Sequence, residues 1–88
     1  MRLDQYLQKT GIVKRRSVAK ELCDAGRVAV DGRSVKASHD VKSGEQLSVH
    51  FRDRRNHFHV KEIPAGNVKR EDRDKYVELT AEELFHED

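Results

Sequence analysis

The sequence predicts an α+β fold, in which two short N-terminal helices pack on a small antiparallel sheet, followed by a C-terminal strand and a short acidic helix. Two observations predict this class. Apolar residues before Gly26 recur at helical spacing, and apolar residues after it alternate with polar ones, as in half-buried strands. A chain of 88 residues supports one modest hydrophobic core, so we expect a single domain over 1–88.

The first helix is indicated by Leu3, Tyr6 and Leu7, which recur at i, i+3 and i+4. These side chains share one face, so we expect them in the core, Tyr6 included. Gly11 follows and can end the helix in a left-handed turn.

A second helix is predicted over about 15–25. Leu22 and Ala25 lie within about 40° of Val18 on a helical wheel, so we expect this face to pack. Gly26 stands where a helix commonly ends.

A β-hairpin is predicted directly after the second helix. Val28 and Val30 share a face, and Val35 lies on the return strand. Between them, Asp31-Gly32 is a strong signal for a two-residue hairpin turn.

Further strands are indicated by alternation in the second half of the chain. Leu47, Val49 and Phe51 fall on one side of a strand, and 58–63 alternates again. The residues 52–56 between them are strongly charged and are predicted to form a turn.

The C-terminus is predicted to contain one more short strand over 76–79 and then a helix. Thr80 and Glu83 fit a capping box that would open an acidic helix carrying Leu84 and Phe85. This helix would be the last element of the chain.

Charge is distributed unevenly along the sequence. Residues 1–55 hold 13 Lys and Arg against 7 Asp and Glu, about +6, whereas residues 56–88 hold 5 against 9, about −4. A basic surface on one part of a small domain attracts polyphosphate. A solvated charged surface with no ligand explains the composition equally well.

The candidate RNA-binding residues gather around the second helix. Arginine binds a phosphate through two directed hydrogen bonds, and the positive N-terminus of a helix adds to the local field. The alternative is that Arg2 or Arg15 pairs with Asp4, Glu21 or Asp24 and ties the helices together. The candidates are Arg2, Lys14, Arg15, Arg16, Lys20 and Arg27.

Other functional classes find little support in the sequence. Cys23 is the only cysteine, which excludes an internal disulfide and leaves no cysteine-based zinc site. His57 and His59 lie two apart without a third convergent ligand, so no metal or other cofactor is expected. Neither a membrane span nor a signal peptide is indicated, and we expect a cytoplasmic, monomeric protein that is not an enzyme.

The first 51 residues resemble the S4-type RNA-binding domain. The resemblance implies the S4 fold for residues 1–51 and leaves 52–88 as a C-terminal β/α extension. It also implies that the helix pair and the adjoining hairpin contact RNA. The residues that stand at the spacing of the family are Arg2-Leu3-Asp4, Leu7, Lys14-Arg15-Arg16, Ala19, Gly26, Val28, Val30, Gly32, Val41 and Gly44.

Among stand-alone S4 proteins, the chain is most similar to the bacterial RqcP family of ribosome-associated quality control, through 14–16, 26–32 and 36–49. This resemblance implies binding to obstructed large ribosomal subunits through rRNA and P-site peptidyl-tRNA. It further implies a role in template-free C-terminal alanine tailing of stalled chains, with the alanine-tailing factor RqcH as a partner.

The sequence leaves three alternatives open. The heat-shock S4 proteins that act on stalled large subunits are also similar, but usually carry a longer basic tail where this chain is acidic. A detached S4 module could act with a separate enzyme, although Met1 and the self-contained C-terminal elements favour a stand-alone protein. A protein-interaction module would use the acidic region 71–88 as its working surface.

Overall fold

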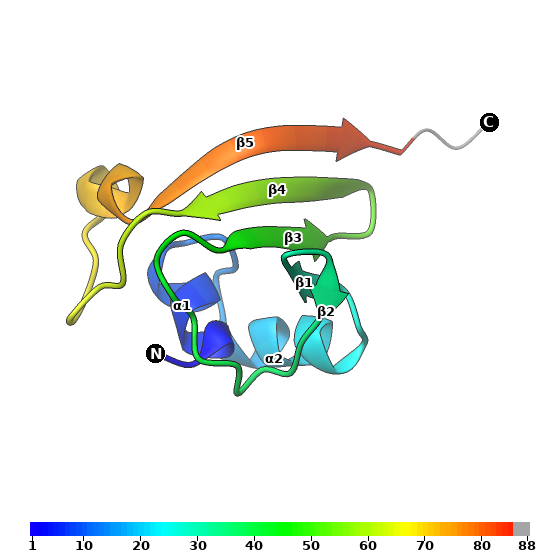
Figure 1. Ribbon diagram of the computed structural model, residues 1–88, viewed down its shortest axis with the longest axis horizontal. Helices are drawn as coiled ribbons and strands as arrows, with labels where there is room; N and C mark the ends of the chain where they lie inside the picture. Colours follow the sequence, from blue (N-terminus) through cyan, green and yellow to red (C-terminus); the bar gives the residue numbers. More distant parts are fainter. Residues whose placement is uncertain (86–88) are drawn as a thin grey trace.

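The computed structural model describes residues 1–85 and confirms the α+β class (Figure 1). Two helices precede a five-stranded antiparallel sheet of order β2-β1-β3-β4-β5. The elements are α1 (Leu3–Lys9), α2 (Arg16–Asp24), β1 (Val28–Val30), β2 (Arg33–Ser34), β3 (Gln46–His50), β4 (Arg54–Val60), the 3-10 helix η1 (Arg70–Lys75) and β5 (Val77–Leu84).

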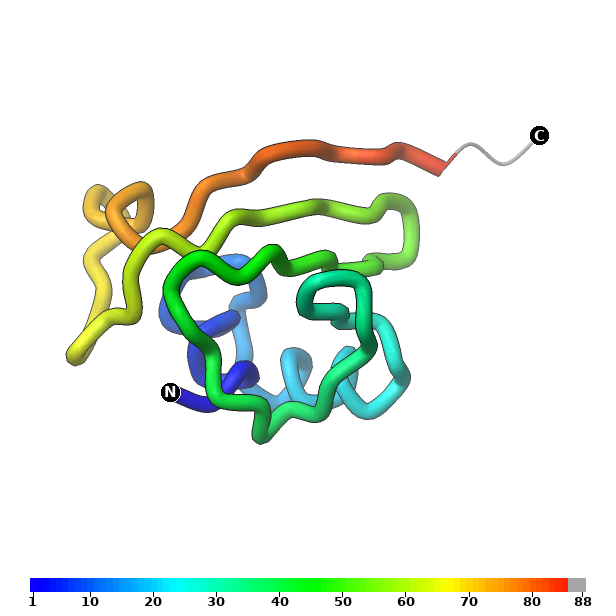
Figure 2. The backbone as a smooth tube through the Cα atoms, viewed as in Figure 1, coloured from blue at the N-terminus to red at the C-terminus, as the bar shows by residue number. Residues whose placement is uncertain are grey.

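The helices lie on one side of the sheet, against β1 and β3, while the β4-β5 hairpin extends beyond them (Figures 1 and 2). Alternate residues of the inner strands point toward the helices and form the core, as the alternation predicted. Tyr6 is fully buried, as expected. The largest fully buried side chains are Tyr6, Leu3, Leu7, Leu47, Val28, Val49 and Val60.

The packing face predicted for the second helix is wrong. Ala19 and Cys23 are buried, whereas Val18 is 40% exposed and Ala25 lies in solvent. Leu22 is partly buried at the margin of the core. Small side chains at the buried positions let α2 approach its neighbours closely, so the stripe of smaller residues faces inward.

The hairpin prediction is confirmed. Asp31 and Gly32 have φ of 50° and 85°, the left-handed pair that a two-residue turn of this kind requires. The Asp31 carboxylate also accepts a hydrogen bond from the Gln46 backbone N–H at 3.1 Å, which joins the turn to β3.

The C-terminal prediction requires two corrections. β4 begins at Arg54, inside the predicted charged turn, and β5 runs to Leu84 where an acidic helix was expected. β5 pairs with β4 along its length, with one bulge near Thr80. The backbone hydrogen bonds of this long ladder outweigh the helical propensity of Ala81, Glu82 and Glu83. The last residues of the predicted helix, 86–88, lie outside the described residues.

The sheet crosses the predicted boundary at residue 51, because β3 and β4 are neighbours in it. The division into a core of 1–51 and an extension of 52–88 stays a prediction. Within residues 1–85, no helix is long and apolar enough to cross a membrane.

Candidate nucleic-acid interface

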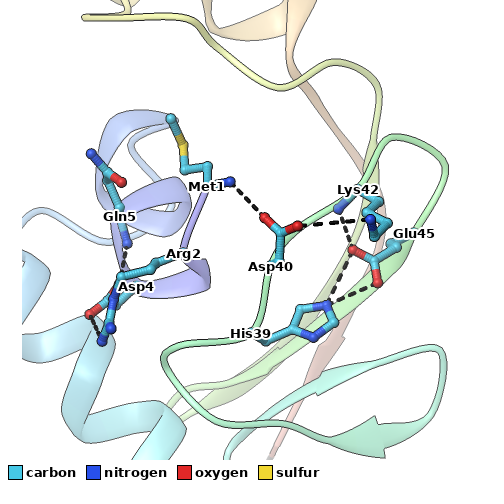
Figure 3. Close-up of polar contacts among 8 residues, drawn as sticks. All are labelled: Met1, Arg2, Asp4, Gln5, His39, Asp40, Lys42 and Glu45. Carbon is cyan, nitrogen blue, oxygen red and sulfur yellow. Dashed lines mark hydrogen bonds and ion pairs between the residues drawn. The ribbon is translucent and has the colours of Figure 1, made fainter.

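The start of the chain is held by the loop that follows the hairpin. The Leu3 backbone N–H donates to the His39 carbonyl at 2.8 Å, and Arg2 and Asp40 form an isolated β-bridge. The N-terminal ammonium donates to the Asp40 carboxylate at 2.8 Å (Figure 3). This hydrogen bond and the ammonium charge hold the pKa of Asp40 below its ordinary value. The loop therefore fixes the position of the Arg2 backbone, from which its side chain extends.

Asp4 lies buried at the base of α1 and gathers two arginines. Its carboxylate accepts from Arg2 Nε at 3.2 Å, lies 3.4 Å from Arg16 Nε and accepts from the Gln5 backbone N–H at 2.8 Å. Burial alone would raise the pKa of Asp4. The hydrogen bonds from Arg2, Gln5 and Arg16, with the charge of Arg16, outweigh burial and hold this pKa below its ordinary value.

The two arginines remain half in solvent while Asp4 is only 3% exposed. The Arg2 side chain is 47% exposed and the Arg16 side chain 50%. Each guanidinium has five N–H donors, so donors remain after the contact with Asp4. The pairing of Arg2 with Asp4, which the sequence offered as an alternative to phosphate binding, therefore leaves both arginines able to bind an anion.

Lys14 and Arg15 are exposed at the turn that enters α2, directly before Arg16. Among residues 1–85, neither makes an ion pair. Arg15 is the N-cap residue, and its side chain makes no capping hydrogen bond. The three consecutive cations therefore surround a helix N-terminus whose backbone N–H groups favour anions.

Lys20 lies one turn farther along α2, where it faces Asp24 at 3.9 Å, a contact exposed on both sides. A pair of this kind contributes well under 1 kcal/mol and leaves the ammonium available. Arg2 and Lys20 line a hollow of about 500 Å³ between α2 and the loop after the hairpin.

Lys36 lines the same hollow and was missed by the sequence reasoning. It comes to Arg2 because the Asp4 backbone N–H donates to the Ala37 carbonyl at 3.2 Å. No sequence pattern indicated this loop contact, because it joins residues more than thirty positions apart. We call Arg2, Lys14, Arg15, Arg16, Lys20 and Lys36 the helix-side cluster.

Arg27, the sixth predicted residue, lies elsewhere. It lines a separate hollow of about 310 Å³, together with residues of β1, β3 and β4 whose side chains point away from the helices. The structure thus brings five of the six predicted residues around α1 and α2 and leaves Arg27 on the other face of the sheet.

Cys23 is buried in the core. Burial, with the nearby Asp4 and Asp24 charges, raises the pKa of Cys23 to about 11, so its thiol stays protonated and unreactive near neutral pH.

His57 and His59 lie on one face of β4, as predicted. Their Nδ1 atoms lie 2.9 Å from Ser48 Oγ and 2.8 Å from Gln46 Nε2. Among the described residues, no group of three or more His, Cys, Asp or Glu is arranged to hold a metal ion.

Comparison with known proteins decides the family. The model of the S4 domain matches residues 1–47, which is more than half of the chain. The chain belongs to the S4-domain family. The S4 segment ends in β3, so it contains both helices, the hairpin and the whole helix-side cluster.

Curated relatives match this S4 chain over most of its length. It is 39% identical over 84 residues to the RQC P-site tRNA stabilizing factor of Bacillus subtilis, covering 96% of this chain and 98% of that protein. It is 40% identical over 78 residues to the protein of the same name from Helicobacter pylori strain 26695, covering 88% and 93%. The predicted membership in this group of S4 proteins is confirmed.

Two solved structures share the fold of this S4 chain. The solution structure of a hypothetical protein gives a TM-score of 0.80 at 38% identity, covering 92% of this chain and 98% of that one. Trimeric Heat Shock Protein 15 of Vibrio cholerae gives a TM-score of 0.82 at 24% identity, covering 92% and 82%. The second likeness concerns the fold alone.

One relative is much longer than this S4 chain. An uncharacterized RNA pseudouridine synthase of Aquifex aeolicus is 37% identical over 90 residues, which cover 93% of this chain but only 37% of the enzyme. The S4 module thus also occurs as part of a larger protein.

Proposed function

We propose that this protein is an RNA-binding factor of ribosome-associated quality control. It binds obstructed large ribosomal subunits through rRNA and P-site peptidyl-tRNA, and its helix-side cluster contacts the phosphate backbone. In this proposal it has no catalytic group and works by binding alone.

One observation carries the proposal. The buried Asp4 carboxylate gathers Arg2 and Arg16 at fixed positions, yet both guanidiniums remain half exposed. Lys14 and Arg15 add two further exposed cations at the N-terminus of α2. Oriented arginines beside a helix N-terminus suit phosphate better than a scattered charged surface does.

The names of the relatives supply the biological setting. Proteins called RQC P-site tRNA stabilizing factors match this chain almost end to end. By analogy, we propose that the chain stabilises the P-site tRNA while the stalled nascent chain receives its template-free C-terminal alanine tail. The alanine-tailing factor RqcH would then act on the same particle, with this chain as a monomer.

Fractionation of the native cells tests the proposal. A tagged copy is expressed in the source cells, lysates are separated on a sucrose gradient, and the RNA that co-purifies is sequenced. We expect the tagged protein to migrate with free large subunits and to recover both rRNA and tRNA. Absence from ribosomal fractions, with no rRNA or tRNA recovered, would refute the proposal.

A charge-reversed variant provides the matched comparison. Changing Arg15, Arg16 and Lys20 to Glu should remove the protein from the large-subunit fractions, because the phosphate-binding surface changes sign. A variant with Arg15 and Lys20 changed to Gln avoids a new carboxylate beside Asp4 and should show a weaker loss. Thermal unfolding of each purified variant verifies that it is folded, and full retention on large subunits by folded variants would contradict the assigned surface.

A second candidate function rests on the pseudouridine synthase relative. Because the matched region is only 37% of that enzyme, the same module could target RNA for a separate catalytic chain here. Mass spectrometry of the tagged purification distinguishes the two. A stoichiometric RNA-modifying enzyme without ribosomal proteins would favour this second function.

A further inference from the structure

A second hollow lies on the face of the sheet that points away from the helices. Ala29, Ser48 and His57 are directly paired across β1, β3 and β4, and their side chains alternate with the core residues. Ala29 and Ser48 have small side chains, so the surface is recessed where they lie. The resulting hollow has a volume of about 310 Å³. We call it the sheet hollow.

Two arginines line the sheet hollow from different elements. Arg27 comes from the turn after α2, and Arg55 comes from the start of β4. The side chains of His50 and His57 and the hydroxyls of Ser34 and Ser48 complete a lining that contains no carboxylate. The only formally charged side chains in this lining are the two arginines, and such a lining favours an anion.

One carboxylate approaches the edge of the sheet hollow from β5. Glu83 lies 3.5 Å from Arg55 Nη1 and 3.5 Å from His57 Nε2. Its side chain is 52% exposed, so water competes for both of these long contacts. A pair of this kind is weak, and an RNA backbone phosphate, with its two non-bridging oxygens, can replace it at Arg55.

Planar side chains lie beside the cations. His50 and Phe85 have ring centroids 5.1 Å apart, and the Arg55 guanidinium lies 5.8 Å from the centre of the Phe85 ring. Phe85 is exposed although it is large and apolar. Exposed rings next to arginines on a sheet surface are a common platform for stacking unpaired RNA bases.

We propose that the sheet hollow is a second RNA-binding surface, in which Arg27 and Arg55 bind a phosphate and the exposed Phe85 ring, which packs at a tilt against His50, stacks on a neighbouring base. The proposal rests on the RNA-binding function argued above and deepens it. With the helix-side cluster on one face and the sheet hollow on the other, one small chain joins two RNA segments. Each bound RNA then raises the effective concentration of the protein for the other.

A sandwich assay tests this directly. Biotinylated tRNA transcript is fixed on beads, the full-length protein is added, and end-labelled fragments of large-subunit rRNA are offered. The measured signal is the labelled RNA captured per amount of protein supplied. We expect capture by the wild-type chain, and about tenfold less by Arg55→Gln, since a charge-assisted hydrogen bond to phosphate is lost.

Arg54→Gln is the matched control. It makes the same change of charge one residue away, on the opposite face of β4, where Arg54 lies 4.7 Å from the Phe51 ring and pairs with Asp53. Capture by this variant should equal that by the wild type. Glu83→Gln should increase capture about threefold, because it removes the competing carboxylate. Circular dichroism during heating verifies the fold of all three variants.

The outcomes separate this inference from the proposed function. Equal capture by folded Arg55→Gln and Arg54→Gln would overturn the sheet hollow as an RNA site. If the wild type binds each RNA alone but never both together, the second surface is also overturned while RNA binding stands. If the wild type binds neither RNA, the proposed function itself fails.

Discussion

The Tyr6 hydroxyl donates a hydrogen bond to the Tyr76 carbonyl at 2.8 Å, across seventy residues of sequence. Tyr6 is fully buried in α1, whereas Tyr76 immediately precedes β5. The same carbonyl accepts from the Lys61 backbone N–H at 2.9 Å, just after β4. The hydroxyl of one core residue thus joins the end of β4 and the start of β5 to the S4 segment.

We predict that Tyr6→Phe lowers the free energy of unfolding by about 1 kcal/mol at neutral pH, the usual contribution of one hydrogen bond. The loss stays modest because the Tyr76 carbonyl retains the Lys61 N–H as a donor. Urea denaturation of the two proteins measures it. A loss above about 3 kcal/mol would contradict this account, because it would require an unsatisfied buried group.

Alkaline pH provides an independent test of the same residue. Burial raises the pKa of Tyr6 well above its ordinary value of 10.0. Its contribution to stability is therefore full below pH 10 and is lost as the pH rises above it, because only the unfolded state ionises there. The stability difference between wild type and Tyr6→Phe should shrink between pH 9 and 11 in urea titrations. A stability difference that is constant over this pH range would refute the raised pKa of Tyr6.

Acid pH probes Asp4, whose pKa lies below its ordinary value of 3.8. A depressed pKa contributes stability above the ordinary value, and this stability is lost as the pH falls through the value in the folded state. We predict that Asp4→Asn costs about 1–2 kcal/mol at pH 7, because hydrogen bonds from Arg2 and Arg16 weaken. The difference from wild type should disappear as the pH falls below 3.8. Urea midpoints from pH 7 to 2.5 measure it, and parallel curves would contradict the prediction.

RNA affinity of Asp4→Asn distinguishes positioning from simple charge. The substitution makes the surface more positive, so charge alone predicts tighter binding. If Asp4 orients Arg2 and Arg16, the variant should instead bind tRNA more weakly in fluorescence anisotropy. Tighter binding would show that the orientation of these arginines does not matter.

Gly11 and Arg73 form another contact between the S4 segment and the C-terminal part. Gly11 has φ of 78°, and a Cβ at this position would overlap the Arg73 guanidinium. We predict that Gly11→Ala costs about 1–2 kcal/mol from the left-handed backbone alone. Displacement of Arg73 should add to this cost.

A double-mutant cycle isolates the second part of the Gly11 effect. In an Arg73→Ala background the overlap disappears, so Gly11→Ala should cost at least about 0.5 kcal/mol less than in the wild type. Urea denaturation of the four proteins measures the coupling. Strict additivity would show that Arg73 moves aside without cost.

Local patterns predicted the elements that depend on neighbours in sequence. The first helix was predictable from the spacing of Leu3 and Leu7, and the hairpin from Asp31-Gly32. Helical periodicity and turn geometry are properties of short segments. The buried face of α2 was not predictable in this way. On a nine-residue helix, the buried face can start at Val18 or at Ala19 with similar apolar spacing. Only contact with α1 decides between these two faces.

Long-range contacts account for the other differences. The segment from Thr80 to Leu84 has helical propensity, yet pairing with β4 makes it a strand. Lys36 joins Arg2 only because the loop after β2 binds the start of the chain. Arg27 is near α2 in sequence but lies on the other face of the sheet, which the charge pattern alone could not reveal.

The salt dependence of RNA binding tests the phosphate contacts of the helix-side cluster one at a time. Each neutralised phosphate releases condensed counterions, so the logarithm of affinity falls linearly with the logarithm of salt concentration. Arg15→Gln should reduce the magnitude of this slope by about 0.7–0.9 if Arg15 binds one phosphate. Lys75→Gln makes the same charge change in η1, beside Asp72 at 3.3 Å, and should leave the slope unchanged. Anisotropy titrations with tRNA at several salt concentrations give the three slopes. An equal reduction in both variants would indicate a diffuse charge effect, and an unchanged slope in Arg15→Gln would remove this residue from the interface.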